Sequence, residues 1–227
     1  LELLLPFKDQ LLPGAIEGYA LPVSDGSEAN RANLRAATAL LEEAGWTVQE
    51  GVLKNAAGEP FAFEILLVNG ADDMISAASI YIEALKRLGI EAKLTTVDSA
   101  QYKERATKYD FDMAHHIRSL SLSPGNEQML YWGAAGVTEP GTRNWMGMNS
   151  PAAEAMIQTM LSSTDRADFV AAVQALDRIL TTGRYVVPIW YSDTSHLAHS
   201  KQLHFPEELP IYGDWLGFQP EVWWYQE

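Results

Sequence analysis

The stretch that decides the fold runs from residue 109 to residue 147. It reads YDFDMAHHIRSLSLSPGNEQMLYWG over residues 109–133 and, after a Gly/Thr/Pro-rich connection, GTRNWMG over residues 141–147. Its beginning predicts a buried strand from Phe111 to Ile117, and the remainder predicts a long irregular loop. Long loops this rich in aromatic residues are more typical of binding segments than of disorder. Because ligands of open α/β sheets lie beyond the carboxyl ends of the strands, we expect this loop to bind the ligand.

The sequence before this stretch alternates between apolar runs and helical patterns. Two runs have strand character, Phe61 to Val68 and Glu91 to Val97. Between them we expect a helix that begins at Asp72 and Asp73, whose carboxylates favour a helix amino terminus, and that ends at Gly89. A short helix capped by Ser99 precedes the third strand. This order predicts a parallel sheet with crossover helices. Further upstream we expect a helix from Asn30 to Ala44, ended by Gly45, and a hairpin-like turn at residues 52–58.

The sequence after the loop is helical at first and then irregular. Ser150-Pro151 is a typical helix start, and a second helix begins at Thr164 or Asp165 and stops at Gly183. Tyr185 to Tyr191 predicts a strand, and its internal proline indicates a sheet edge or a strand end. From residue 194 to residue 227 the chain is rich in Pro and aromatic residues and has no clear period. These aromatic side chains need a partner surface, which we expect to lie outside this chain.

Composition narrows the classes of function. The chain has 227 residues, no cysteine and a net charge of -14. The absence of cysteine excludes a disulfide-stapled mini-domain, and the acidic balance argues against a nucleic-acid partner. No apolar run reaches the roughly 20 residues that span a bilayer. The chain does not begin with Met and shows no signal peptide, so we interpret it as a mature or trimmed piece of a longer polypeptide.

Catalytic and metal-binding patterns are weak. His115 and His116 are adjacent, and on a strand they point to opposite faces, so they cannot share one metal. Ser119, Ser121 and Ser123 raise the possibility of a serine hydrolase using one of these histidines. None of the three serines lies in a Gly-x-Ser-x-Gly elbow. The sequence therefore predicts a protein that is not an enzyme and needs no cofactor or metal.

The two arginines of the stretch are the strongest binding candidates. Arg118 at the strand end and Arg143 in the loop are suited to clamp a carboxylate or peptide carbonyls, although pairing with acidic residues is an equal alternative. Aromatic residues such as Tyr131, Trp132 and Trp145 are suited to stack on a ligand or to fill the core. The predicted ligand-binding residues are the following: His116, Arg118, Ser119, Ser121, Arg143, Asn144 and Trp145.

Several runs together resemble a known family. LLEEAGW, PFAFEILL and EALKRLGIEAKLTTVDSAQYKERATKYDFDM are similar to the peptide/nickel class of extracytoplasmic solute-binding proteins that serve ABC transporters. SPGNEQMLYWG, PGTRNWMG, DRADFVAAVQALDRIL, YVVPIWY, PIYGD and EVWWY resemble its YejA-like oligopeptide-binding branch. The resemblance covers roughly residues 30 to 227.

The resemblance implies a periplasmic protein of two lobes that closes on oligopeptides and delivers them to an inner-membrane permease. It implies that residues 1–193 are the C-terminal ligand-binding lobe and that residues 194–227 return to an N-terminal lobe of the same polypeptide. The implied fold is an α/β periplasmic-binding-protein-like lobe: a mostly parallel sheet flanked by helices, followed by an irregular aromatic-rich tail. A lone lobe lacks the second wall of the cleft, so we expect weak peptide binding or none from it.

One departure from the family pattern concerns the ligand. Well-studied peptide binders of this class hold the peptide's amino terminus with an aspartate just beyond the strand that matches Phe111 to Ile117. Here that region reads RSLSLSPGN, without an aspartate. A nickel chelate or another small polar solute on the same fold stays open as an alternative, as does a non-transport interaction domain.

Overall fold

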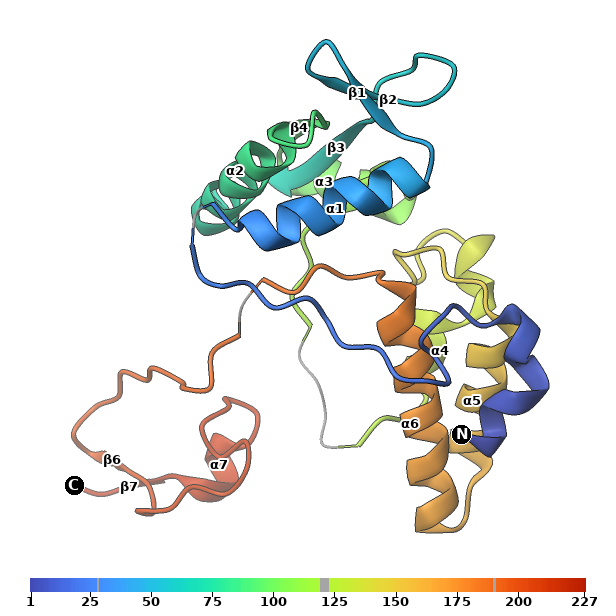
Figure 1. Cartoon of the computed structure of the whole chain (residues 1–227). Helices are drawn as coiled ribbons and strands as arrows, with labels where there is room; N and C mark the ends of the chain where they lie inside the picture. Colours follow the sequence, from blue (N-terminus) through green and yellow to red (C-terminus); the bar gives the residue numbers. More distant parts are fainter. Residues whose placement is uncertain (28, 119–122, 190) are drawn as a thin grey trace. The chain divides into compact units, whose positions relative to one another are not determined.

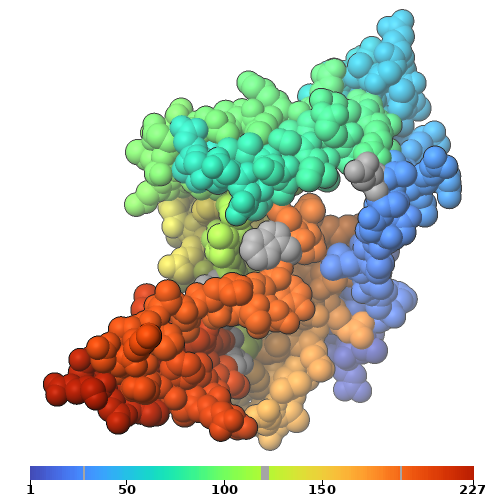
Figure 2. Space-filling view, turned by 90° about the vertical axis from the view of Figure 1, so that its left-hand side faces the viewer, coloured from blue at the N-terminus to red at the C-terminus, as the bar shows by residue number. Residues whose placement is uncertain are grey.

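The computed structural model describes residues 1–27, 29–118, 123–189 and 191–227. The chain divides into two compact units, Leu1–Tyr185 and Val186–Glu227. Their elements can be followed by colour from blue to red in Figure 1, and the surface atoms of residues 186–189 and 191–227 are orange to red in Figure 2. No helix in the described ranges is long and apolar enough to cross a membrane.

A three-stranded parallel sheet forms the centre of the first unit's α/β part. Its strands are β3 (Ala62–Val68), β4 (Glu91–Val97) and β5 (Met113–Ala114), in the order β4-β3-β5. The connections are the helices α2 (Asp72–Lys86) and α3 (Ser99–Thr107). Strands and crossover helices alternate as the sequence predicts, because each helix must cross back before the next parallel strand can pair.

The two faces of the sheet are covered by different helices. On one face Ile65 and Leu67 of β3 pack with Ala78 and Ile82 of α2. On the other face Leu66, which has no exposed surface, lies on the side of β3 that α3 covers. Successive strand residues point to opposite faces, so this apolar run from Ile65 to Leu67 is buried on both sides, as predicted.

The amino-terminal extension of this α/β part is a helix and a small hairpin (Figure 1). Helix α1 spans Arg31–Glu43, and the hairpin pairs β1 (Thr47–Gln49) with β2 (Val52–Lys54). Gly45 has a φ of +87°, which confirms it as the residue that ends the helix. Leu53 of the hairpin is buried in a further apolar cluster with Leu85 of α2 and with Ile90, which directly precedes β4.

A helical part completes the first unit. Its elements are η1 (Glu2–Gln10), α4 (Glu127–Trp132), η2 (Ala134–Val137), α5 (Pro151–Ser162) and α6 (Arg166–Gly183). The helices α5 and α6 pack side by side around Ile157, which is fully buried. Both begin as predicted, because the side chains of Ser150 and Asp165 accept hydrogen bonds from the first turns.

The second unit has little regular structure. Its elements are β6 (Leu203–His204), α7 (Gln219–Val222) and β7 (Trp224–Tyr225), with β6 and β7 antiparallel. Its centre is Trp223, whose ring lies 4.4 Å from that of Phe205 and whose Nε1 donates to the Gly213 carbonyl over 2.7 Å. One buried tryptophan thus organises this unit.

The third predicted strand is much shorter than its apolar pattern suggests. Only Met113 and Ala114 pair with β3. Before them, the Asp112 carboxylate accepts the Glu64 N–H over 2.8 Å, and after them the Tyr102 hydroxyl donates to the His115 carbonyl over 2.6 Å. Side chains at both ends take up backbone groups that a longer ladder would use.

One other prediction at an element end was wrong. Asp98, not Ser99, caps α3, because its carboxylate accepts from the N–H groups of Ala100 and Gln101. Helix α6 ends at Gly183 as predicted, and Arg184 follows it in the left-handed conformation. A Cβ at Gly183 would lie 2.1 Å from a ring atom of Tyr185, so the absence of a side chain also matters for packing.

Two longer segments also differ from the prediction. The loop of residues 119–149 contains α4 and η2 within its described part, so it is less irregular than expected. In the described part of residues 185–191, none of the residues forms a strand, and Val186, Val187 and Ile189 are exposed. Their apolar pattern predicts a strand only where a neighbouring strand is available to pair.

Candidate functional site

The chain leaves the sheet at the carboxyl end of β5 and enters a group of aromatic and basic side chains. Residues His115 to Arg118 follow β5 directly. The second part of the site is the turn of residues 143–147. It is brought close because the Gly141 N–H donates to the Thr107 carbonyl and the hydroxyls of Tyr109 and Thr142 share a hydrogen bond of 2.5 Å.

Trp145 is the centre of the aromatic half of this site. Its ring lies 4.9 Å from the His116 ring, 5.9 Å from Phe111 and 6.3 Å from Tyr102. The contacts join α3, the residues on either side of β5 and the turn of residues 143–147. Such tilted aromatic contacts form a semi-rigid surface on which a ligand side chain or backbone can pack.

Tyr131 of α4 is the centre of the basic half. The Arg118 guanidinium carbon lies 3.7 Å from the Tyr131 ring centroid, which is a cation–π contact. Arg143 lies 5.6 Å from the same centroid, and its Nη1 donates to the Tyr131 hydroxyl over 3.2 Å. One tyrosine therefore contacts both arginines.

The electrostatics of this half are dominated by positive charge. Burial lowers the pKa of His116, and the charges of Arg118, His115 and Arg143 lower it further. Burial also lowers the pKa of Arg118. Among the described residues, no carboxylate forms a salt bridge with Arg118 or Arg143. Arg118 is thus a partly buried cation that interacts with Glu127 without forming a salt bridge, whereas His116 and Arg143 are exposed.

Asn144 has a different position from its neighbours. It is fully buried, and its amide nitrogen donates to the carbonyls of Gly133 and Met148 over 2.9 and 2.8 Å. Its carbonyl oxygen accepts the Met148 N–H over 2.9 Å. Both N–H groups of the side chain are used, so Asn144 closes the turn that presents Trp145 and does not face a ligand in this structure.

A small pocket of about 290 Å³ adjoins the basic half between α4, α5 and α6. Its lining is mostly apolar, with Arg118, Glu127 and Asp177 at its polar points. Trp132 also lines it and is 8% exposed, and its Nε1 is the one buried side-chain nitrogen or oxygen in the described ranges without a hydrogen-bond partner.

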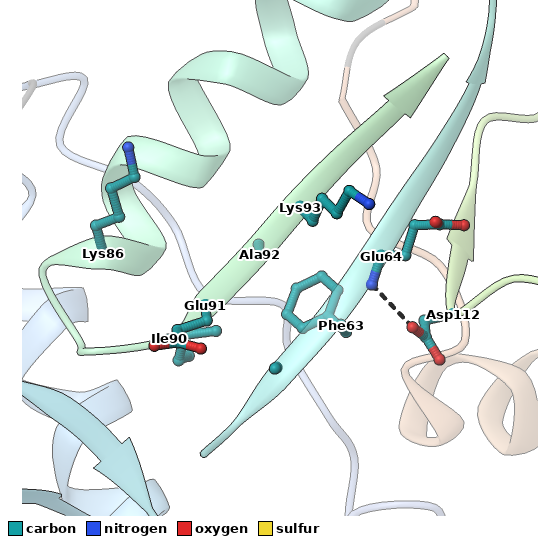
Figure 3. A pocket seen from close by; sticks show the side chains of 9 residues that line it. Phe63, Glu64, Lys86, Ile90, Glu91, Ala92, Lys93 and Asp112 are labelled. Carbon is teal, nitrogen blue, oxygen red and sulfur yellow. Dashed lines mark hydrogen bonds between the residues drawn. The ribbon is translucent and has the colours of Figure 1, made fainter. Parts of the chain in front are cut away.

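A second pocket lies at the opposite edge of the sheet, where the strands begin (Figure 3). It measures about 590 Å³ and is lined by the first residues of β3 and β4 together with Asp112. The pocket is lined by both positively charged lysines and negatively charged carboxylates. One of the carboxylates, Glu64, already forms a salt bridge with Arg105 and accepts a hydrogen bond from Thr95. This pocket was not predicted from the sequence, and ligands of open α/β sheets lie at the other edge.

The predicted site residues separate into three groups. His116, Arg118, Arg143 and Trp145 are brought together, and Asn144 supports the turn behind them. Ser119 and Ser121 lie outside the described residues. The contributions of Tyr102 and Phe111 were missed, since only their contact with Trp145 identifies them. Within the described ranges, no group of three or more His, Cys, Asp or Glu side chains is arranged to hold a metal ion.

Comparison with known proteins identifies the family. The family model described as "Bacterial extracellular solute-binding proteins, family 5 Middle" matches residues 9–139. The uncharacterized protein y4wM of Sinorhizobium fredii is 42% identical over 91% of this chain and 30% of its own length. The probable peptide-binding protein YejA of Agrobacterium fabrum is 36% identical over 99% of this chain and 36% of its own length. The chain thus spans about a third of these relatives.

A solved structure supports the fold. The oligopeptide-binding protein AppA from Bacillus subtilis, solved with a nonapeptide, superimposes with a TM-score of 0.60 at 23% identity, covering 66% of this chain and 30% of AppA. The resemblance to YejA-like proteins and the periplasmic-binding-protein fold are both confirmed. The chain belongs to family 5 of the bacterial extracellular solute-binding proteins, a family of binding proteins and not of enzymes.

Proposed function

We propose that this chain is the ligand-binding part of an oligopeptide-binding protein that works in the periplasm with an ABC importer. Its relative from Agrobacterium fabrum carries the name of a probable peptide-binding protein, and AppA was solved with a nonapeptide. The action is reversible binding, followed by closure of two lobes and delivery to an inner-membrane permease. No covalent chemistry is required of the chain.

One observation in the structure carries this proposal: the aromatic and basic group at the carboxyl end of β5. Trp145 and His116 form one surface, and Tyr131 holds Arg118 and Arg143 beside it. A peptide offers side chains to pack on the rings and backbone or terminal oxygens to accept from the guanidinium groups. The four residues form the ligand contacts, and Asn144 acts by positioning the turn.

The second unit supports a role for a further part of the polypeptide. Several of its large apolar residues are exposed, among them Ile211 at 70%, Leu216 at 83% and Tyr225 at 65%. Exposed apolar groups of this size mark surfaces that pack against something else. We assign residues 194–227 to packing on the N-terminal lobe, and residues 1–193 to the ligand-binding lobe. Because half a cleft lacks its second wall, the isolated chain should bind peptides weakly or not at all.

The test is native mass spectrometry of the full-length protein as purified from its own periplasm, followed by denaturing release of whatever travels with it. A ladder of short peptides is the expected result. A single non-peptide mass or a nickel adduct would overturn the peptide assignment while leaving the family unchanged.

Site variants make the test specific. Replacing Arg118 or Arg143 by Ala should weaken peptide binding by about 1–3 kcal/mol, the value of a hydrogen bond to a charged group. The matched control is Arg184→Ala, because Arg184 also lies over a tyrosine, 4.7 Å from the Tyr19 centroid, but lies after α6 and away from the site residues in the sequence. Equal titration curves for all variants would remove these residues from the site.

A further inference from the structure

The pair Asn69-Gly70 follows the central strand of the parallel sheet. Of all the asparagines in the chain, only Asn69 is followed by glycine. Both residues are exposed, and they form the turn between β3 and α2. Because β3 and β5 are parallel neighbours, this turn lies at the same edge of the sheet as the start of the candidate ligand site.

The geometry of this turn leaves its backbone accessible. The Ala71 N–H donates to the Val68 carbonyl over 3.3 Å, and Gly70 has a φ of +84°, as in a type II turn with glycine at its third position. This hydrogen bond is longer than the usual range of about 2.7–3.2 Å. A Cβ at Gly70 would meet no atom within 4 Å. The turn therefore has open space around it and a weak hydrogen bond across it.

The Asn69 side chain and the Gly70 nitrogen are not held by hydrogen bonds. Among the described residues, none bonds to the Asn69 side chain, and the Gly70 N–H has no acceptor. Other asparagines are restrained: Asn55 donates to the Glu59 carboxylate over 2.8 Å, and the buried Asn144 makes three hydrogen bonds. Because glycine has no side chain, the Gly70 nitrogen is also sterically open to the Asn69 amide.

A comparable pair, Asp25-Gly26, shows the opposite arrangement. The Asp25 Oδ1 accepts from the Ser27 N–H over 2.9 Å and from the Ser27 hydroxyl over 2.6 Å. The Gly26 N–H donates to the Ser24 hydroxyl over 3.1 Å. The hydrogen bonds from Ser27 lower the pKa of Asp25, and an ionised carboxylate has no good leaving group for ring closure. Attack by the following nitrogen is thus hindered at Asp25, whereas Asn69 has none of these restraints among the described residues.

We propose that Asn69 is a site of spontaneous deamidation in which the Gly70 backbone nitrogen is the nucleophile. This nitrogen loses its proton to hydroxide and forms a bond to the Asn69 Cγ. The Cγ–Nδ2 bond breaks, and the leaving nitrogen takes a proton from water and departs as ammonia. Water then opens the succinimide ring: attack at Cγ gives Asp, and attack at the main-chain carbonyl gives isoaspartate. One water is consumed and one ammonia released, without oxidation or reduction.

The two products change this edge of the sheet in different ways. Both add a negative charge close to Asp72 and Asp73, the first residues of α2. Isoaspartate also adds a methylene group to the main chain, directly after the Asn69 N–H, which donates to the Val97 carbonyl over 2.7 Å. We expect isoaspartate to weaken this connection between the ends of β3 and β4, whereas Asp at the same position should keep it. The inference is independent of the proposed function.

The test is peptide mapping by mass spectrometry of the full-length protein, aged at neutral and mildly alkaline pH in water labelled with heavy oxygen. The internal control is Asn149, which is exposed and has no side-chain hydrogen bond in the described ranges, but is followed by Ser150. We expect Asn69 to convert at least about tenfold faster than Asn149, a barrier difference of about 1.4 kcal/mol. The product should carry heavy oxygen, and its rate should rise with hydroxide concentration.

Two variants and a free peptide complete the test. Asn69→Gln should stop the conversion, because its longer side chain disfavours ring closure, and Asn69→Asp supplies one product directly. Hydrogen exchange of the residue 69 amide should become faster in the isoaspartate fraction and stay slow in Asn69→Asp. A rate at Asn69 no higher than that at Asn149 would overturn the proposal. So would a rate more than about a hundredfold below that of a synthetic peptide of residues 65–74, since the fold would then protect the turn.

Discussion

Asn144→Ala is the substitution that most directly tests how the site is held. The side chain of Asn144 is fully buried and makes three hydrogen bonds of 2.8 to 2.9 Å to the backbone of Gly133 and Met148. Both of these residues are themselves buried. Alanine would remove the side-chain partners of the Met148 carbonyl and N–H in a region closed to water, whereas the Gly133 carbonyl would keep the Gly136 N–H as a donor.

The size of the effect follows from these contacts. Each hydrogen bond contributes about 1 kcal/mol to stability, so the loss should reach about 3 kcal/mol, and more where water cannot replace the side chain. Asn144→Asp should be at least as damaging, because it keeps the acceptor for the Met148 N–H but removes both donors and buries a charge.

Urea unfolding measures the global effect, and hydrogen exchange of the Met148 amide measures the local one. The matched control is Asn149→Ala, since Asn149 is exposed and has no side-chain hydrogen bond among the described residues. A loss of less than about 0.5 kcal/mol for Asn144→Ala, the range of ordinary surface substitutions, would refute the view that this side chain holds the turn. Equal effects at both positions would do the same.

Two further predictions follow from local contacts. Asp98→Ala should destabilise the chain by about 1 kcal/mol because it removes the acceptor for the first turn of α3, whereas Ser99→Ala should have almost no effect in the same urea titration. In an NMR titration, Arg118→Ala should raise the pKa of His116, because one of the positive charges that lower it is removed, while burial keeps it below its ordinary value. With that pKa lowered in the folded state, His116 in the unmodified chain should reduce stability as the pH falls below about 6.5, since only the unfolded state then gains the proton. A pKa of His116 that is unchanged by the substitution would contradict this account of the charges.

Much of the fold was predictable from the sequence for local reasons. The run from Ile65 to Leu67 is apolar on both faces, and the helix that follows it carries its apolar residues at helical spacing. Ser150-Pro151 predicted the start of α5, because capping by a hydroxyl and a proline in the first turn depend only on neighbouring residues. The parallel order followed from the alternation of strands and helices.

Element ends were predicted less well wherever a distant group decided them. The apolar pattern of residues 111–117 gives no sign that the Asp112 carboxylate and the Tyr102 hydroxyl take over backbone groups on either side of β5. Similarly, Val186 and Val187 have strand character, but no described strand pairs with them. A propensity becomes a strand only when a partner completes the hydrogen bonds.

The candidate site shows the same division between local and tertiary information. The sequence determined which chemical groups follow β5, namely two histidines, two arginines and several aromatic rings, and it indicated the family. Only the tertiary structure decided that Tyr131 holds both arginines, that Trp145 joins three segments, and that Asn144 faces inward. The physical reason is that spacing along a chain fixes the periodicity of a helix or strand, whereas the approach of residues 102, 116, 131 and 145 depends on how the helices pack and where the loops are tied.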